Sequence, residues 1–538
     1  MGRVFIGIDV GTGSARAGAF DAAGRLLGTA RHPIRIWHET GGVVEQSAED
    51  IWRACIAATR ATLAESGVAA DAVAGIGFDA TCSLVAVDRA GMPVSVSPSG
   101  DPARNVIVWM DHRASAEARQ ITETGEEVLR YVGGTISPEM QTPKLLWLKK
   151  HLAKSFAAAG HFFDLPDYLT YRATGAVARS ACTVTCKWTY LAHERRWSRA
   201  YFERIGLGEL LADGAARIGE TIVAPGAALG EGLSLQAAAD LGLRPGIPVG
   251  AALIDAHAGG IGSVGGRHGD TPVVVARRLG YIMGTSACIM ATTEQPSFVS
   301  GVWGPYYSAM IPGYWLNEGG QSAAGAAIDH LVRAHPAFDQ AMREASGQPV
   351  LEFLEGRVVN LAGGNPALLA RDLHVLPEYL GNRSPFADPD ARAVVVGLGL
   401  EEDVDNLARL FVAGLCGLAY GFCDVLDALK GQGVAPDMVV MSGGASHSPL
   451  VRRIMADATG IDIALPTSPE PVLLGAAMLG AVAARAQADI PAAMAAMSEI
   501  GHVAKPDPRS AAFHGAKRSV HKSMQTMECE ARRLMKQC

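Results

Sequence analysis

The chain of 538 residues is long enough for two large domains or for three to four smaller ones. It carries 47 Lys and Arg against 54 Asp and Glu, and the net charge of −7 disfavours nucleic acid and anionic membranes as partners. Because 49% of the residues are hydrophobic and 19% are charged, the composition supports a large core and excludes wholesale disorder.

A β-meander is expected to open the chain, followed by an amphipathic helix, a buried strand and, after a mixed stretch, a second buried strand. In chain order these elements are predicted over residues 3–9, 15–20, 25–30, 47–66, 71–78 and 247–254. The last segment is almost continuously apolar, which is typical of a strand in a sheet covered on both faces.

The second half repeats the opening pattern of strand, Gly-Thr-Ser turn and strand. Gly284-Thr285-Ser286, between strands over 279–283 and 287–292, echoes the segment Ile8–Ser14. This echo predicts two domains built on one plan, with the second beginning near residue 276. The remaining elements are a long apolar helix, a strand, a helix, a strand and an apolar helix, expected over 401–430, 437–442, 448–458, 461–466 and 471–484.

Two of these segments are apolar enough to resemble membrane spans. Arg409 and Asp424 interrupt the stretch 407–426, and the stretch 471–484 is too short to cross a bilayer. We therefore expect both to be buried helices. The tail, residues 501–538, holds eight Lys and Arg against three Asp and Glu. A basic tail can bind an anionic partner, but a solvated helix docked on the body is the favoured interpretation.

The cysteines and the N-terminus favour a cytoplasmic protein. The nine cysteines form no CxxC pair, which disfavours zinc ribbons and thioredoxin-like motifs, and their odd number fits reduced thiols. Residues 1–9 include Arg3 and Asp9 and lack the long apolar run of a signal peptide.

The first candidate phosphate site is a hairpin turn. No GxxxxGK[ST] motif occurs, so a P-loop is excluded. Gly11-Thr12-Gly13 is followed by a strand, which disfavours a dinucleotide fingerprint. The N–H groups of the turn and the hydroxyls of Thr12 and Ser14 can bind phosphate, and Asp9 beside them can hold Mg²⁺ directly or through water. The alternative is a decorated β-turn.

Asp255 is the candidate general base. It follows a buried strand and precedes a helix of small residues, at the sheet edge where ligands bind in α/β proteins. There it can take the proton from an attacking hydroxyl, or it can simply cap the following helix. His257 can be a ligand or a base, although a packed role is favoured. The turn Ser442–Gly444 lets backbone approach a flat ring or a ribose, or it only connects a strand to a helix.

Further motifs are Trp109–Arg113, Asn317–Ser322, and Gly381–Pro385 followed by Asp388, Pro389 and Arg392. Together with Ile8–Ser14 and with Ser442–Gly444 and Met455–Asp457, they resemble the ATPase core of actin, heat-shock chaperones and sugar kinases. The chain from about 3 to 485 resembles the FGGY carbohydrate kinases, in which the signature that Gly381–Pro385 matches lies near ATP. Three further segments, Phe78–Ser83, Cys186–Trp188 and Ile254–His257, are similar to the ribulokinase-like branch of pentulose kinases. Arg453 departs from the family, in which many relatives carry Gln.

The resemblance implies an α/β fold with two actin-like, ribonuclease-H-like ATPase domains that flank a deep catalytic cleft. Residues 1–275 would bind the sugar and carry the base, 276–485 would bind ATP, and 486–538 would form a helical basic tail packed on the body. The implied reaction is phosphorylation of a pentulose, with D-ribulose giving D-ribulose 5-phosphate as the expected case. Mg-ATP would be the donor, and Asp255 the general base.

The resemblance also implies three sets of binding residues. The sugar would contact Thr81, Cys82, Trp109, Asp111, Lys187 and Glu318. ATP would contact Thr12, Gly13, Ser14, Gly284, Thr285, Gly443, Gly444, Ala445 and Ser448, and Mg²⁺ would lie at Asp9. Structural roles stay open for four of the sugar residues: Asp111 as an ion pair with Arg113, Lys187 as a solvated lysine, Trp109 as a pocket wall, and Cys82 as a packing residue.

Two other functions fit the same core. A kinase for L-ribulose, D-xylulose, ribitol, erythritol or glycerol would use the same chemistry. A non-catalytic actin-like ATPase switch would phosphorylate no small molecule, but the combination of Asp255, Trp109, Asp111 and Glu318 argues against it. The expected partner is a small sugar, with no nucleic acid and no membrane, and a homodimer is expected by analogy with such families.

Overall fold

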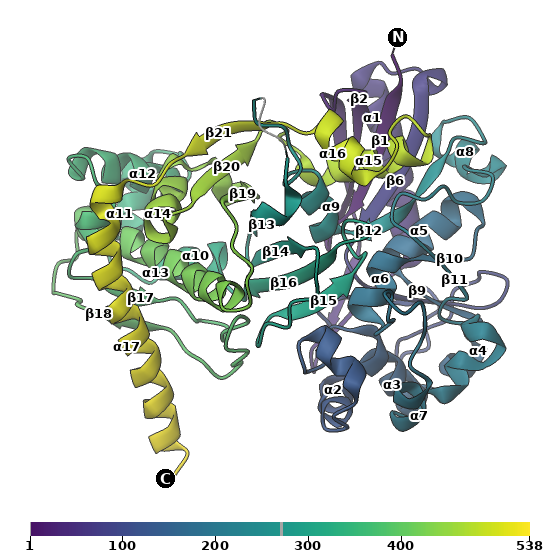
Figure 1. The fold of residues 1–538 in the computed structure, drawn as a ribbon, viewed down its shortest axis with the longest axis horizontal. Coiled ribbons are helices and arrows are strands. Elements are labelled where there is room, and N and C mark those ends of the chain that lie inside the picture. The colour runs from purple at the N-terminus through teal and green to yellow at the C-terminus, as the bar shows by residue number, and fades with distance from the viewer. Residues whose placement is uncertain (1, 270–272, 538) are drawn as a thin grey trace.

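The computed structural model describes residues 2–269 and 273–537 and arranges them in two lobes (Figure 1). The first lobe is built on a five-stranded sheet with the order β12-β6-β1-β2-β3. Its strands are β1 (Val4–Val10), β2 (Ser14–Asp21), β3 (Leu26–Pro33), β6 (Val73–Ala80) and β12 (Val249–Ile254). The first three form the expected antiparallel meander, and β6 and β12 continue the sheet in parallel.

The second lobe is built on a seven-stranded sheet with the order β15-β16-β14-β13-β19-β20-β21. Its strands are β13 (Arg278–Met283), β14 (Ala287–Thr293), β15 (Trp303–Tyr307), β16 (Trp315–Gln321), β19 (Met438–Ser442), β20 (Asp462–Pro466) and β21 (Ile500–Ala504). Five of these strands, β16-β14-β13-β19-β20, repeat the arrangement of the first sheet, because a meander is again followed by two parallel strands. The two-domain plan expected from the Gly-Thr-Ser echo is therefore confirmed.

A second five-stranded sheet, which was not expected from the sequence, extends the first lobe. Its order is β4-β5-β8-β7-β9, with β4 (Ile36–Glu39), β5 (Val43–Gln46), β7 (Leu84–Val87), β8 (Val106–Ile107) and β9 (His161–Asp164). These strands are two to four residues long, too short for a clear alternation of polar and apolar residues. Two small sheets pair β10 (Ala178–Ser180) with β11 (Thr221–Val223) and β17 (His374–Leu376) with β18 (Val394–Val396).

Helices cover the sheets of both lobes (Figure 1). Those before the second sheet are α1 (Ala48–Ser66), α2 (Ser115–Thr122), α3 (Gln141–His151), α4 (Ala153–Ala158), α5 (Leu165–Thr174), α6 (Ala181–Lys187), α7 (Arg199–Arg204), α8 (Leu235–Leu241) and α9 (Asp255–Ile261). The helices that follow β16 in the chain are α10 (Gly325–Arg333), α11 (Phe338–Ala345), α12 (Val350–Leu361), α13 (Val404–Lys430), α14 (Pro449–Thr459), α15 (Pro471–Ala483), α16 (Ile490–Met497) and α17 (Ala511–Met535).

Helix α13 is a core helix of the second lobe. It is long and apolar enough to cross a membrane, but 94% of its most apolar window is buried inside the fold. Asp403 caps its N-terminus by accepting a hydrogen bond from the N–H of Asn406. The burial explains the apolar sequence, as expected.

Helix α15 belongs to the second half of the sequence but packs on the first lobe, against β6, β1, β12 and α9 (Figure 1). Glycines make this close approach possible. A Cβ atom on Gly77 would lie 1.9 Å from the carbonyl oxygen of Ala476, and one on Gly7 would lie 2.0 Å from that of Leu473. The segment 471–484 was expected in the second domain by its place in the sequence. In the structure it packs on the sheet of the first lobe.

The tail contains more than the predicted basic helix. Helix α16 packs against α15, and β21 pairs antiparallel with β20 at the edge of the second sheet. Helix α17 then runs along the second lobe beside β17 and β18 (Figure 1). The strand β21 was missed because its sequence, Ile-Gly-His-Val-Ala, lies in a short segment between two helical ones.

Candidate active site

The carboxyl ends of three parallel strands form one wall of the site. Asp9 on β1 lies opposite Asp79 on β6, and Ile254 at the end of β12 lies opposite Ala80. Asp255 follows β12 directly, and α9 begins with it. The register thus brings carboxyl groups from distant segments to the same sheet edge, where ligands bind in α/β folds.

A cavity of about 300 Å³ lies at this edge, and residues from both halves of the chain line it. From the first lobe it is lined by Asp9, Gly11, Thr12, Arg16, Thr81, Cys82, Trp109, Glu139, Lys187, Ile254, Asp255 and Ala256. From the second half of the chain it is lined by Ile282, Ser286, Cys288, Trp303, Glu318, Arg383 and Val472. The structure therefore brings the predicted base, the predicted metal residue and five of the six predicted sugar residues to one cavity.

Asp255 has the environment of a proton acceptor. Its Oδ1 accepts a hydrogen bond from the N–H of Ala256 at 2.8 Å, so the carboxyl group does not cap a later turn of the helix. Burial, together with the nearby charge of Asp9, raises the pKa of Asp255 to about 6. A carboxylate with such a pKa can take a proton at neutral pH more readily than an exposed one.

Asp9 is held by Arg16, the residue opposite it in the β1–β2 hairpin. The Nε of Arg16 donates to Asp9 Oδ2 at 2.8 Å, and its Nη1 donates to Glu470 Oε2 at 2.9 Å. Asp79 next to Asp9 is fully buried, and burial and the Asp9 charge raise its pKa well above the usual range. No donor in the described part of the chain reaches either carboxyl oxygen of Asp79.

These carboxylates fit a hydrated Mg²⁺ better than a protein-enclosed metal. Within residues 2–269 and 273–537 no group of three or more His, Cys, Asp or Glu side chains could hold a metal ion by itself. Mg²⁺ typically takes one or two carboxylates and keeps waters and substrate phosphates as its other ligands. Asp9 and Asp255 on the cavity wall are carboxylates of this kind, and Oδ2 of Asp9 is bound to Arg16.

Lys187 from the first lobe and Glu318 from the second lobe both line the smaller cavity. Burial alone would lower the pKa of Lys187, but the neighbouring Cys82 and Glu318 raise it well above the ordinary value. Burial would raise the pKa of Glu318, but the charges of Lys187 and His257 lower it to about 2. The Lys187 ammonium also lies 5.4 Å from the centre of the Trp303 ring. Both groups are therefore charged inside a cavity, and Lys187 is not a solvated surface lysine.

His257 connects Glu318 to a buried cysteine. Its Nδ1 lies 3.1 Å from Cys182 Sγ, and its Nε2 lies 3.5 Å from Glu318 Oε2. Burial disfavours the imidazolium, but the negative charges of the Cys182 thiolate and the Glu318 carboxylate raise the pKa of His257 to about 10. His257 is fully buried and does not line the cavity, so it acts on Glu318 from behind.

Trp109 links the cavity wall to the first hairpin. Its Nε1 donates to Thr12 Oγ1 at 3.0 Å, and its backbone N–H donates to Ser83 Oγ at 3.1 Å. Thr81 hydrogen-bonds Ser83 through the two hydroxyls at 3.2 Å. Burial raises the pKa of Cys82 to about 12, so this thiol is a wall of the cavity and no nucleophile.

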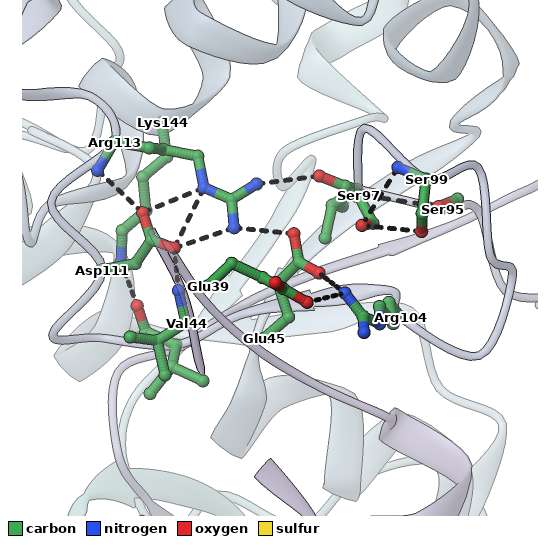
Figure 2. A network of polar contacts seen from close by, with 12 residues as sticks. Glu39, Val44, Glu45, Ser95, Ser97, Ser99, Arg104, Asp111, Arg113 and Lys144 are labelled. Atoms are coloured by element: carbon green, nitrogen blue, oxygen red, sulfur yellow. Dashed lines mark hydrogen bonds and ion pairs between the residues drawn. The ribbon is translucent and has the colours of Figure 1, made fainter. Parts of the chain in front are cut away.

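Asp111 is the one predicted sugar residue that does not line the smaller cavity. Figure 2 shows it in a buried network, where its Oδ2 accepts from the N–H of Val44 at 2.6 Å and from Arg113 Nη2 at 2.8 Å. Arg113 also binds Glu45 at 2.8 Å. Oδ1 of Asp111 accepts from the backbone N–H and the Nε of Arg113, each at 2.9 Å, so protein donors engage both carboxylate oxygens, as in the ion pair considered for this residue.

A second cavity, of about 730 Å³, lies in the second lobe. Of the predicted ATP residues, Gly284, Thr285, Gly444, Ala445 and Ser448 line it. Gly443 supports it from outside: its φ is +86°, and a Cβ atom there would lie 2.5 Å from the carbonyl oxygen of Met283.

Two predicted phosphate residues of the first hairpin, Gly13 and Ser14, line neither cavity. Ser14 is buried, and its hydroxyl accepts from Arg31 Nε at 2.9 Å. The Gly13 carbonyl accepts from the N–H of Ile34 at 3.0 Å. Both residues thus serve the hairpin itself, while Thr12 at its tip reaches the cavity.

Several lining residues were not predicted. In the smaller cavity they include Arg16, Glu139, Trp303 and Arg383; in the larger one they include Asp329, Glu352, Glu355, Phe411 and Leu415. Arg383 lines the smaller cavity, although its segment, Gly381–Pro385, resembles a family signature near ATP. Arg453, the departure from the family pattern, binds Asp457 at 2.7 Å and Asp507 at 3.1 Å and lines neither cavity.

Comparisons with known proteins agree with this geometry. The family model of the N-terminal domain of FGGY carbohydrate kinases matches residues 4–262, and that of the C-terminal domain matches residues 279–484. The chain therefore belongs to the FGGY family of carbohydrate kinases. It is a phosphotransferase that uses ATP as the phosphate donor and a small-molecule sugar as the acceptor.

Individual relatives extend over most of the chain. An FGGY carbohydrate kinase domain-containing protein of Homo sapiens is 45% identical over 527 residues, covering 96% of this chain and 95% of the relative. A D-ribulokinase of Saccharomyces cerevisiae is 36% identical over 513 residues, covering 89% of this chain and 72% of the relative. The crystal structure of a xylulose kinase from Rhodospirillum rubrum has a TM-score of 0.78 at 21% identity, covering 98% of this chain and 99% of that one, which supports the two-domain actin-like fold.

Proposed function

We propose that this carbohydrate kinase phosphorylates a pentulose, and that D-ribulose, giving D-ribulose 5-phosphate, is its substrate. The support is the D-ribulokinase of Saccharomyces cerevisiae, 36% identical to this chain. Two bacterial ribulokinases, from Geobacillus thermodenitrificans and Halalkalibacterium halodurans, are 30% identical over 506 and 509 residues. The motifs that resemble the pentulose-kinase branch point to the same substrate.

The observation that carries the proposal is the meeting of Asp255, Lys187 and Glu318 in one cavity of about 300 Å³. A small polyhydroxylated sugar needs both donors and acceptors, and the Lys187 ammonium and the Glu318 carboxylate supply them as charged groups. Thr81 and Trp109 would complete the sugar site, with Cys82 as its wall.

In the proposed mechanism, Asp255 accepts the proton of the terminal hydroxyl while that oxygen attacks the γ-phosphate. Because the transition state of phosphoryl transfer is loose, positioning and neutralisation of charge do most of the catalysis. Asp9 would hold Mg²⁺ through water, and the ion would neutralise charge on the phosphates. Lys187 and Glu318 orient the sugar. Arg383 in the same cavity supplies a second fixed positive charge beside that of Lys187.

The nucleotide would occupy the larger cavity. Its phosphates would lie between the hairpin turns at Thr12 and at Gly284–Thr285, and its adenosine would lie against Gly444, Ala445 and Ser448. Ser448 caps α14 by accepting a hydrogen bond from the N–H of Val451 at 3.0 Å, so the helix N-terminus is fixed next to the nucleotide.

An ADP-release assay with Mg-ATP tests the proposal against D-ribulose, L-ribulose, D-xylulose, ribitol, erythritol and glycerol. We expect the highest kcat/KM with D-ribulose. A preference for another pentulose or for a polyol would overturn the substrate and keep the reaction class. No turnover of any acceptor would favour the ATPase-switch alternative.

The role of Asp255 is tested by Asp255→Asn, which removes the proton acceptor and keeps its size. We expect turnover to fall by at least ~10²-fold, as for the loss of a general base. The matched control is Asp339→Asn, which neutralises an exposed carboxylate in the first turn of α11. Near-normal turnover of Asp255→Asn would remove Asp255 from the catalytic role.

A further inference from the structure

Arg383 reaches the catalytic cavity from a loop that has little regular structure. The loop, residues 378–392, runs between β17 and β18. The guanidinium carbon of Arg383 lies 5.5 Å from the centre of the Trp303 ring. Its side chain also lies over Gly320 on β16, where an added Cβ atom would come within 3.2 Å of Arg383 Cδ. Arg383 is therefore packed onto the strand that carries Glu318.

The loop is tied internally by one asparagine. The N–H of Asn382 donates to the carbonyl of Asp388 at 2.8 Å, and its Nδ2 donates to Glu378 Oε1 at 2.7 Å. Its Oδ1 accepts from the N–H of Phe386 at 3.0 Å. These bonds join residues 378–388 into one unit. A displacement of Asp388 would therefore also displace Asn382, the neighbour of Arg383.

The outer side of this unit is held by the C-terminal helix α17. Arg532 binds both carboxylate oxygens of Asp388 through its two Nη atoms. Glu528 accepts from the backbone N–H of Arg392 at 3.0 Å and from Arg532 Nε at 2.7 Å. Such fork-like contacts between arginine and a carboxylate fix orientation as well as distance.

The helix α17 is itself anchored on the second lobe. The buried Lys517 donates to the carbonyl of Ala370 at 2.6 Å, and Gln525 donates to Asp424 of α13 at 2.9 Å. Figure 1 shows α17 running past β17 and β18, which flank the loop. The helix is thus a fixed support for the loop.

We propose that Glu528 and Arg532 of α17 are positioning residues for phosphoryl transfer: through Arg392 and Asp388 they hold the loop 378–392 so that Arg383 stays in the catalytic cavity. The inference rests on the proposed function, because it gives Arg383 the task of neutralising charge on the transferred phosphoryl group. It assigns the basic tail a role in catalysis at a site that it does not touch.

A double-mutant cycle tests the connection between tail and cavity. We expect Arg383→Ala to lower kcat by about 10²-fold, the usual loss for a donor to transition-state charge, and Arg532→Ala to lower it by about 10-fold with a smaller change in the KM for ATP. If Arg532 acts through Arg383, the double variant will be no slower than Arg383→Ala. Arg532→Lys, which keeps the charge but loses the fork, should recover part of the loss.

Arg533→Ala is the matched control, since Arg533 binds Glu530 on the same helix at 2.6 Å and is exposed to solvent. Its turnover should equal that of the wild type. Multiplicative effects of Arg383→Ala and Arg532→Ala, or wild-type turnover of Arg532→Ala, would overturn the proposal.

Amide hydrogen exchange gives a readout that does not depend on the substrate. In Arg532→Ala, exchange should rise at the amides of Asn382, Phe386 and Arg392, with the rest of the second lobe unchanged. Exchange that rises throughout that lobe, or that does not rise in the loop, would refute a positioning role. If the wild type turned over none of the sugars, the proposed function would fail, while this measurement would still decide whether α17 holds the loop.

Discussion

Replacing Gly475 with alanine tests whether the tight packing of α15 supports the catalytic carboxylate. Gly475 faces α9, the helix that begins with Asp255. A Cβ atom at position 475 would lie only 1.9 Å from the carbonyl oxygen of Ala258. Since carbon and oxygen atoms in contact need more than 3 Å, α15 and α9 would have to separate by about 1 Å or more.

The expected magnitude follows from two opposing terms. Alanine favours a helix interior over glycine by about 1 kcal/mol. Overpacking of a well-filled core costs about 1–3 kcal/mol, and more where backbone meets backbone. With a net loss of about 2 kcal/mol, the midpoint of thermal unfolding should fall by about 4–8 °C for a lobe of this size. Because a displacement of about 1 Å near a reacting group can cost 10²-fold in rate, kcat should fall by at least ~10-fold.

The assay is a pair of thermal unfolding curves at one heating rate, together with initial rates of ADP release. Gly515→Ala is the control, because Gly515 also lies inside a helix, α17, but has no atom within 4 Å of the added Cβ. It should raise the unfolding midpoint by about 2–4 °C. Normal turnover and an unchanged or higher midpoint in Gly475→Ala would refute the reasoning that α15 fixes the position of α9.

Three further outcomes follow from the charged groups of the cavity. Because the pKa of Asp255 is about 6, kcat/KM for Mg-ATP at saturating sugar should be constant above pH 7. Below pH 7 it should fall as Asp255 is protonated, to about one tenth of its plateau at pH 5. A profile that stays flat to pH 5 in the folded enzyme would contradict this prediction. Cys182→Ser should leave that limb in place, and a shift of the limb in this variant would assign it to the Cys182–His257 pair instead. Lys187→Met should raise the KM for the sugar by about 10- to 100-fold, since a hydrogen bond to a charged group contributes about 1.5–3 kcal/mol. The KM for ATP should change by less than about 2-fold. Equal effects on both KM values would place Lys187 outside the sugar site.

The part of the site that was predictable from sequence is the part fixed by the order of strands. Asp9, Thr81 and Asp255 each stand at the end of an apolar run, and parallel strands bring such ends to one edge. The contact between Arg16 and Asp9 was also within reach, because a short hairpin turn sets the register that places them opposite each other. The pairing was not predicted, because the prediction used the residues of the turn and Asp9 and did not extend to the register of the strands that follow.

The parts that were not predictable depend on contacts between segments far apart in the chain. Asp111 lies in a motif that resembles a sugar-binding one, yet its carboxylate accepts a hydrogen bond from the N–H of Val44, 67 residues away in the chain. The position of Arg383 in the smaller cavity was not predicted, because the direction of a long loop is set by its supports and not by its own sequence. Those supports, Glu528 and Arg532, lie in a tail that composition alone shows only to be basic.

The packing of α15 explains why residues outside the cavity can control its chemistry. The helix comes from the second half of the chain, yet it packs against α9 and against β1 and β6, the strands that carry Asp9 and Asp79. Glu470, which precedes it, binds Arg16, and Arg16 binds Asp9. One helix therefore contacts the supports of both the candidate magnesium residue and the candidate base. We therefore expect a change at the buried interface of α15 to alter phosphate binding and proton transfer together, and a change at Lys187 or Glu318 to alter sugar binding alone.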